Sequence, residues 1–310
     1  MDKCSYFIDN KALFGSFPSQ AVINEFENIG VKYFVDLTSN IEEKLCPYKT
    51  KFTYISFPIP DRRIPVSWSS FAIFIVRLCD IISNLNVNEK IYIHCRGGHG
   101  RSGIVVASIL CYLFKLSPEE SLEKTRHYHG LRETMRDKWR RIGSPQTKSQ
   151  KIFIQKFFSE FCIHGMQRKG CVYEFSNYAP IQVTIPDLGT FKYAEAAFQA
   201  FKNPLCKEYV SKQIASKTPA VSKTLGRCTD LRADWYEKRD QIMFKILIYK
   251  FNQHPYLKEK LLNTGFRSFI DKTNFDYYWG YVHGNGKNVF GNLLEKVRLH
   301  FYREYISLPI

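Results

Sequence analysis

Most of the reactive side chains that the sequence brings together lie in residues 93–103, which read IHCRGGHGRSG. Cys95 and Arg101 stand six residues apart and enclose a loop with three glycines. Glycine accepts positive φ angles, so the amides of such a loop can point inward and form a nest for an anion. A guanidinium can hold two oxygens of one phosphate, and the same positive environment stabilises a thiolate. The spacing therefore predicts a phosphate-binding loop, whose members are Arg96, Gly97, Gly98, His99 and Gly100.

The elements around this loop are predicted to be a strand before it and a helix after it. Residues 90–94 are rich in β-branched and aromatic side chains, whereas residues 101–114 are almost wholly apolar and indicate a buried helix. The N-terminus of that helix then points at the loop and favours an anion there. Strands that alternate with helices predict an α/β domain with a central mixed or parallel sheet flanked by helices. The other predicted elements of this half are strands at 33–37 and 53–57 and helices at 67–85, 117–128 and 148–162.

The pattern His-Cys, five residues, Arg-Ser resembles the signature of the protein tyrosine phosphatase superfamily. The small size of the domain, about residues 10–162, is similar to that of the dual-specificity branch. Three further stretches match that branch, and they are residues 13–18, residues 57–62, and residues 144–147 with Gln150 after them.

This resemblance implies a role for each reactive residue. Cys95 is the nucleophile, Arg101 binds the phosphoryl group, and Asp61 is the general acid and then the general base. Ser102 can donate a hydrogen bond to the sulfur and help it to leave. The route needs no metal and no cofactor, and no cluster of His, Cys and Asp has metal-ligand spacing.

Two histidines of this segment stay open to two interpretations each. His94 is expected to hydrogen-bond the loop from below, with a direct role as the alternative. His99 lies on the loop rim, where it is either solvated or in contact with substrate.

Composition narrows the class of protein. The chain has 310 residues, a formal net charge of +16 and nine cysteines. The positive charge suits either a basic patch for nucleic acid or pockets for anionic, phosphate-bearing substrates. The odd number of cysteines and the absence of CxxC argue against a disulfide framework and a zinc ribbon, and favour a reducing, cytoplasmic compartment. No membrane span and no secretory signal are expected.

The second half is predicted to be a separate, mainly helical α+β domain. Helical periodicity fails between Cys162 and Gly170, so we expect domains at 1–164 and 165–310. Helices are predicted at 194–202, 207–215, 219–225, 232–250, 255–262 and 290–304.

The first of these helices has a polar face and an aromatic face. Glu195, Gln199 and Lys202 share one side, and Phe198 and Phe201 lie on the other. Such a helix suits a nucleoside pocket, in which rings stack on the base and a carboxylate lies near the sugar. An ordinary amphipathic helix explains the same spacing.

The order of the motifs in this half resembles the NADAR, or YbiA-like, family of N-glycosidases. The matching stretches are 173–178, 194–202, 232–251 and 261–294. The resemblance implies cleavage of ribosylamine bonds, or removal of ADP-ribose from guanine, through an oxocarbenium-like state. It also implies Glu195 as the catalytic carboxylate, and a pocket formed by Asn177, Gln199, Lys202, Asp276 and Trp279. The sequence departs from the family pattern at Ala196, where many relatives have histidine, and at Asp271, where glutamate is expected.

These observations predict a bifunctional enzyme, a cysteine-dependent phosphatase joined to an N-glycosidase. The expected substrates are a phosphorylated protein, nucleotide or RNA for the first domain and an ADP-ribosylated or ribosylamine nucleotide for the second. One alternative is that the second domain binds ADP-ribose without cleaving it. Another is an RNA 5′-phosphatase, which the basic stretch at 132–141 allows and which a solvated helix face explains equally well. The sequence leaves the oligomeric state open.

Overall fold

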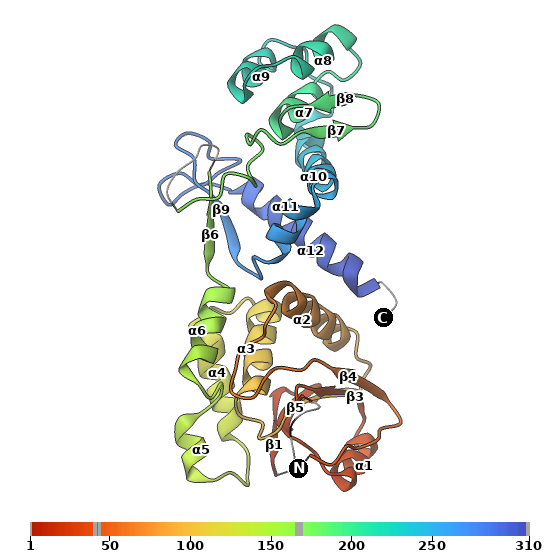
Figure 1. The fold of residues 1–310 in the computed structure, drawn as a ribbon, viewed down its shortest axis with the longest axis vertical. Coiled ribbons are helices and arrows are strands. Elements are labelled where there is room, and N and C mark those ends of the chain that lie inside the picture. Colours follow the sequence, from red (N-terminus) through yellow and green to blue (C-terminus); the bar gives the residue numbers. More distant parts are fainter. Residues whose placement is uncertain (1, 40–41, 43–44, 165–169, 308–310) are drawn as a thin grey trace. The chain divides into compact units, whose positions relative to one another are not determined.

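The computed structural model describes residues 2–39, 42, 45–164 and 170–307 (Figure 1). Its internal contacts divide the chain into two compact units. The first unit comprises Met1–Ser159 together with Tyr305–Ile310, and the second comprises Glu160–Glu304.

The first unit is built on a five-stranded sheet in the order β1-β2-β5-β3-β4. Strand β5 is central and runs parallel to β2 and β3, while β4 is parallel to β3 and β1 is antiparallel to β2. The α/β prediction and its three strands are thus confirmed, and the β1–β2 hairpin is an addition that the sequence had not suggested. The strand bounds are β1 Cys4–Ile8, β2 Ala12–Ser16, β3 Val31–Asp36, β4 Thr53–Ser56 and β5 Lys90–Cys95.

The side chains of each strand alternate between the two faces of the sheet, so each face needs helices to cover it. On one face, Ile23 and Phe26 of α1 (Gln20–Asn28) pack against Leu13, Phe34 and Tyr92. Helix α3 (Arg101–Phe114) contacts β2 and β5, and its residues from Arg101 to Cys111 are buried. The other helices of the unit are α2 Trp68–Ser83, α4 Pro118–Gly130, α5 Asp137–Ile142 and α6 Lys148–Phe157.

One predicted helix was too long. We expected a helix over 148–162, but α6 ends at Phe157 and strand β6 (Glu160–Ile163) follows. This strand pairs in parallel with β9 (Ser268–Asp271), more than 100 residues later in the chain. Because β9 is so distant in sequence, the local pattern of residues 160–163 gives no sign of the pairing. The pattern alone therefore predicts that the helix continues through β6.

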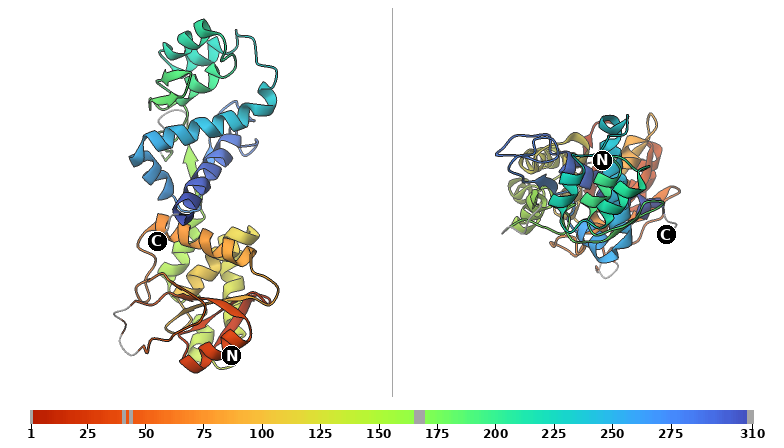
Figure 2. Two further views of the ribbon diagram at one scale, coloured as in Figure 1. Left: turned by 90° about the vertical axis from the view of Figure 1, so that its right-hand side faces the viewer. Right: turned by 90° about the horizontal axis from the view of Figure 1, so that it is seen from above.

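The second unit is mainly helical, as predicted. Helix α10 contacts α7, α11 and strand β7 and is the long light-blue helix in the left view of Figure 2. A short antiparallel hairpin, β7 (Val183–Ile185) and β8 (Gly189–Phe191), precedes α7. All six predicted helices are present, and they are α7 Ala194–Ala200, α8 Lys207–Ile214, α9 Pro219–Leu225, α10 Trp235–Gln253, α11 Pro255–Leu262 and α12 Val289–Ser307.

The predicted domain boundary lies beside residues 165–169, which are outside the described residues. The compact units divide earlier, between Ser159 and Glu160, so that β6 belongs to the second unit. Nearby, Cys162 and Cys171 form a disulfide, although the cysteine count argued against a disulfide framework. A single pair of cysteines nine residues apart lacks the CxxC spacing, so nothing in the sequence indicated this bond. Within the described residues, no helix is both long and apolar enough to span a bilayer.

Candidate active sites

The predicted phosphate loop connects the last residue of β5, Cys95, to the first residue of α3, Arg101. Cys95 is buried, and its Sγ lies 3.6 Å from Ser102 Oγ. Gly98 has a φ of +71°, and a Cβ on it would lie 2.5 Å from the carbonyl carbon of Gly15. Glycine therefore permits both the turn of the loop and its close approach to β2.

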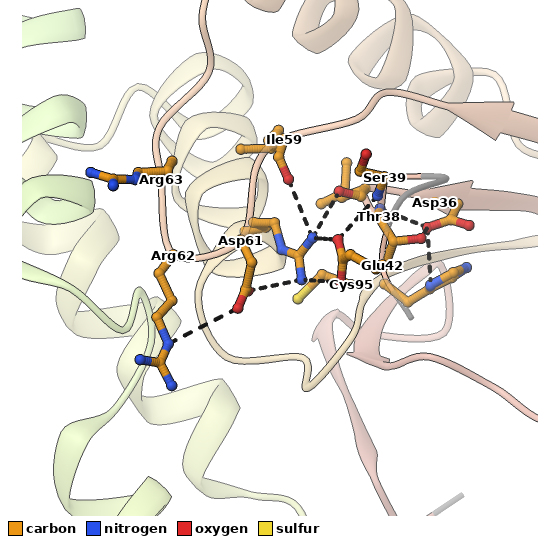
Figure 3. Close-up of polar contacts among 12 residues, drawn as sticks. Asp36, Thr38, Ser39, Glu42, Ile59, Asp61, Arg62, Arg63 and Cys95 are labelled. Carbon is orange, nitrogen blue, oxygen red and sulfur yellow. Dashed lines mark hydrogen bonds and ion pairs between the residues drawn. The ribbon is translucent and has the colours of Figure 1, made fainter. Parts of the chain in front are cut away.

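Arg101 connects the loop to the two carboxylates that face it. Its side chain is 2% exposed, and Nη2 lies 3.0 Å from Asp61 Oδ1 and 3.1 Å from Glu42 Oε2. Nη1 donates to Glu42 Oε1 and, at 3.2 Å, to the carbonyl of Ile59. Figure 3 shows Asp61, Glu42 and Cys95 close together. Burial would lower the pKa of Arg101, but the hydrogen bonds that it donates to Glu42 and the nearby negative groups raise it.

Asp61, which the resemblance to the phosphatases implies as the general acid, is in contact with two arginines. Its side chain is 53% exposed and contacts Arg101 on one side and Arg62, at 4.0 Å, on the other. The prolines around it, at positions 58, 60 and 65, belong to a segment without helix or strand. The structure therefore brings Asp61 and Arg101, 40 residues apart in sequence, into direct contact.

Glu42 is a site residue that sequence reasoning missed. It lies in the segment between β3 and β4, 59 residues before Arg101, with no motif around it. Burial opposes ionisation, but hydrogen bonds from Arg101 and from the Ser39 amide hold the pKa of Glu42 below its usual value. The carboxylate is thus a fixed negative partner for Arg101.

The two histidines contact other residues than we expected. His94 was predicted to hydrogen-bond the loop, but its Nε2 lies 2.6 Å from the hydroxyl of Tyr48. Burial lowers the pKa of His94 to about 4. His99 is half-buried, stacks on Trp139 at 4.6 Å between ring centroids and places Nδ1 2.8 Å from His129 Nε2. His99 is therefore packed against other side chains and is not a freely solvated loop residue.

The late motif of the phosphatase resemblance adjoins the loop as well. Ser144 Oγ donates to the carbonyl of His99 at 2.6 Å, and Gln150 Nε2 donates to the carbonyl of Arg63 at 3.1 Å. A Cβ on Gly100 would collide with the Gln150 side chain. Gln150 therefore lies between the phosphate loop and the segment that carries Asp61.

The second unit contains a cavity of about 440 Å³. Its walls come from the segment before β7, from α7, α9 and α10, and from the loop that follows β9. The predicted catalytic carboxylate, Glu195, lines this cavity, and so do all of the predicted pocket residues, which are Asn177, Gln199, Lys202, Asp276 and Trp279.

Glu195 is the most constrained of these residues. It is 3% exposed, and each carboxylate oxygen accepts a hydrogen bond, one from Asn177 Nδ2 and one, at 2.8 Å, from Gln199 Nε2. Its amide donates to the carbonyl of Asn177 at 2.9 Å. Burial raises the pKa of Glu195, while the charge of Lys223 and the bond from Gln199 act against this rise.

Two lysines bring positive charge to the cavity. Lys202 Nζ donates to the carbonyl of Gly226 at 2.8 Å, and burial lowers its pKa. Lys223 was not predicted as a site residue. Burial would lower its pKa, but Glu195 and the hydroxyl of Tyr178 raise it. Lys223 is therefore a stable cation beside the buried carboxylate.

Two aspartates also line the cavity: Asp271 is the last residue of β9, and Asp276 lies in the segment that follows it. Asp276 Oδ1 accepts the amides of Tyr278 at 3.1 Å and Trp279 at 2.9 Å, which fixes its side chain. Asp271 stands where glutamate was expected. Burial, with the nearby charge of Asp276, raises its pKa to about 7. Asp271 is thus a carboxyl group that can carry a proton near neutral pH.

An aromatic wall faces these charges. The ring of Phe198 lies 4.9 Å from that of Trp235 and 5.3 Å from that of Trp279. Phe198 and Glu195 both come from α7 and line the same cavity, so Phe198 does not lie on a separate face from the polar residues as we predicted. Trp235, the first residue of α10, was not predicted as a pocket residue.

A buried lysine supports the segment that carries Asn177. Lys250 is 0% exposed, and its Nζ donates to the carbonyls of Glu174 at 2.9 Å and Ser176 at 2.7 Å. Burial lowers its pKa to about 7. Through this segment, the ammonium group of α10 sets the position of the amide that binds Glu195.

The described residues contain no group of three or more His, Cys, Asp or Glu side chains placed to hold a metal ion. Both sites consist of charged, polar and aromatic protein groups.

Comparison with known families matches both halves of the chain. The family described as "Polymorphic toxin system, DSP-PTPase phosphatase" matches residues 12–114. The family described as "NADAR domain" matches residues 160–302. The two matches fall in the two compact units.

Individual relatives match all or part of the chain. "Putative tyrosine phosphatase 197R" of Invertebrate iridescent virus 6 is 32% identical over 96% of this chain and 95% of its own length. "N-glycosidase YbiA" of Escherichia coli is 38% identical over 40% of this chain and 79% of its own length. Among solved structures, Tk-PTP in its active form is 23% identical with a TM-score of 0.40 and covers 50% of this chain and 94% of that chain.

Proposed function

Because this chain belongs to a family in which a dual-specificity-type tyrosine phosphatase domain precedes a NADAR domain, we propose that it is a bifunctional hydrolase. The first unit would hydrolyse phosphate monoesters. The second would cleave the N-glycosidic bond of an ADP-ribosylated or ribosylamine nucleotide.

The contact between Arg101 and Asp61 supports the first part of the proposal, because these two residues would be the phosphate-binding group and the proton donor. Arg101 would hold two phosphoryl oxygens while the Cys95 thiolate attacks phosphorus. As the ester P–O bond breaks, Asp61 would give its proton to the leaving oxygen. A water activated by Asp61 would then attack the phosphocysteine, and Ser102 would stabilise the departing thiolate.

A simple aryl phosphate tests this mechanism. The parent protein is expected to release phosphate, whereas Cys95→Ser is expected to lose turnover but retain phosphate binding. The alkoxide is not accessible as the thiolate is, but Arg101 and the loop amides remain. Near-normal turnover by Cys95→Ser would refute the assignment of the nucleophile.

The buried carboxylate of Glu195 carries the second part of the proposal. Positive charge develops on the ribose as an N-glycosidic bond breaks, and a fixed carboxylate in a water-poor pocket stabilises it strongly. The aromatic wall at Phe198, Trp235 and Trp279 would stack on the base. Lys202 and Lys223 would attract the phosphates, and Asp271 would protonate the leaving base.

The direct test is to incubate the protein with ADP-ribosylated guanine in DNA and RNA and with ribosylamine nucleotides. Release of ADP-ribose or of the free base supports the enzyme. If the parent protein binds these compounds but releases nothing, the second unit is a binding module that recruits the phosphatase. The retained Glu195, with both of its oxygens engaged by amides, favours catalysis.

The basic stretch at 132–141 gives limited support to an RNA 5′-phosphatase. Arg132 and Arg140 donate to backbone carbonyls of their own unit and are part of its structure. Arg136, Lys138 and Arg141 are exposed. These three residues are too few to single out RNA, so we propose a phosphomonoesterase without this restriction. Its hydrolysis of RNA 5′-phosphates should be compared with its hydrolysis of phosphopeptides.

A further inference from the structure

Gly226 directly follows α9 in the second unit and contacts the polar side chains of α7. It is buried, and its backbone has ordinary right-handed helical angles, with φ −70° and ψ −10°. Its amide donates to the carbonyl of Ser222 at 2.9 Å. Residues with a side chain adopt these angles readily, and alanine is favoured over glycine in helical backbone. The backbone conformation therefore does not explain why glycine stands at this position.

Two side chains of the cavity occupy the space beside Gly226. A Cβ on this residue would lie 1.9 Å from Gln199 Oε1 and 2.8 Å from Gln199 Cδ, which is too close for atoms that are not bonded. The carbonyl of Gly226 also accepts a hydrogen bond from Lys202 Nζ at 2.8 Å. The backbone of α7 is held in place, because all of its residues are buried and the hydroxyl of Tyr209 donates to the carbonyl of Gln199 at 2.8 Å. A side chain at position 226 would therefore displace the amide of Gln199.

The amide of Gln199 acts on Glu195. Its Nε2 donates to Glu195 Oε1 at 2.8 Å, and this bond favours the ionised carboxylate against the effect of burial. Oε1 of Gln199 is buried and has no hydrogen-bond partner among the described residues. Packing against Gly226, and not a second hydrogen bond, thus holds this end of the amide in place.

We propose that Gly226 is a positioning residue of the second unit, because the absence of a side chain lets the amide of Gln199 reach and orient the carboxylate of Glu195. Gly226 itself does not line the cavity, so it acts through Gln199 and not on the substrate. The proposal rests on the glycosidase function proposed above.

Gly226→Ala, Gln199→Ala and the double variant test this coupling. Cleavage of ADP-ribosylated guanine in DNA should fall by roughly 10- to 10²-fold in Gly226→Ala, the scale of a misplaced catalytic group. Gln199→Ala removes the amide, so the addition of Gly226→Ala should reduce cleavage no further. The matched control is Gly130→Ala in the first unit, where a Cβ would have no described neighbour within 4 Å and cleavage should not change. If Gly226→Ala cleaves normally, or if the two losses multiply in the double variant, the proposal is refuted.

A carbon-13 NMR titration of the Glu195 carboxyl group, assigned with Glu195→Gln, is a second readout that needs no catalysis. Loss of the bond from Gln199 should raise the pKa of Glu195 in both Gly226→Ala and Gln199→Ala, but not in Gly130→Ala. The other charged groups that act on this carboxylate are kept in every variant, and they are Lys202, Lys223 and Asp276. An unshifted pKa in Gly226→Ala would refute the proposal.

The two readouts separate the failure of this proposal from the failure of the proposed function. If the parent protein cleaves no glycosidic bond, the glycosidase function fails, while the titration still decides whether Gly226 acts on Glu195. Thermal unfolding shows whether each variant folds. If Gly226→Ala fails to fold and the double variant folds, the collision with Gln199 is supported. If both fail to fold, the glycine has a structural role and the proposal is refuted.

Discussion

The guanidinium of Arg101 and the carboxylate of Glu42 form a bidentate pair, in which Nη2 lies 3.1 Å from Oε2 and Nη1 donates to Oε1. Two parallel hydrogen bonds of this kind fix the plane of a guanidinium as well as its position. The carboxylate thereby also fixes the orientation in which Arg101 would present Nε, and the Nη2 donor that now binds Asp61, to a phosphate. Glu42 is therefore a positioning residue.

Glu42→Ala should impair both stability and turnover. It leaves the buried charge of Arg101 without its main partner, so the free energy of unfolding should fall by about 3 kcal/mol. The KM for an aryl phosphate should rise more than kcat falls, because the misplaced group binds the phosphate. Urea unfolding and steady-state kinetics measure both effects, and Glu42→Gln, which keeps the shape, should restore part of the KM. Glu25→Ala on the exposed side of α1 is the control. An unchanged KM would mean that Glu42 does not position Arg101.

Asp61→Asn should act according to the leaving group. Substrates with poor leaving groups should slow by roughly 10²–10⁴-fold, the usual effect of losing a positioned acid. Substrates with very acidic leaving groups need little protonation and should slow much less. A series of aryl phosphates with different phenol acidities measures this difference. Equal losses across the series would assign Asp61 a structural role through its contact with Arg101.

Glu195→Gln should keep nucleotide binding within a few-fold and reduce glycosidic cleavage by roughly 10²-fold or more, the scale of a lost electrostatic stabiliser. Because burial raises the pKa of Glu195, cleavage by the parent protein should increase with pH as this group loses its proton. Glu195→Asp should also be impaired, since a shorter side chain moves the charge by about an ångström. Product release measured from pH 4 to 8 tests these points. Full activity in the Gln variant would exclude the carboxylate from the reaction.

Asp271→Asn should change how glycosidic cleavage depends on pH above neutrality. The pKa of Asp271 is raised to about 7 by burial and by Asp276, so a proton donor at this position is lost above neutral pH. The parent protein should therefore show cleavage that declines above about pH 7, and the Asn variant should be slow and lack this decline. If the decline persists in Asp271→Asn, another group titrates there.

Lys250→Met should alter how the stability of the second unit depends on pH. Burial lowers the pKa of Lys250 to about 7, well below that of an unfolded lysine, about 10.4. Between these values the unfolded chain binds the additional proton, so the parent protein should become more stable as pH rises from 7 towards 10. Calorimetry at pH 7 and 9 should show this gain in the parent and in the exposed control Lys245→Met, but not in Lys250→Met. The same gain in all three proteins would place the titration elsewhere.

The sequence predicted those parts of the two sites that come from continuous segments. The loop from Cys95 to Arg101 and the face of α7 with Glu195 and Gln199 depend on local spacing, which a single sequence displays. Glu42 and Lys223 were missed because each reaches its site from a segment without a motif. Their contacts depend on how distant segments fold together. The same reason explains β6, whose extended backbone is set by β9 and not by its own residues.

The close approach of the phosphate loop to β2 limits how this protein can evolve. A Cβ on Gly98 would meet the backbone of Gly15, and a Cβ on Gly15 would lie 2.6 Å from the hydroxyl of Tyr92 and 2.7 Å from Cys4 Cβ. A larger residue at position 15 would have to shift the edge of the sheet and the loop together. The two glycines are therefore under one shared steric constraint. We expect substitutions of Gly15 among active homologues to be as rare as substitutions within the catalytic signature itself.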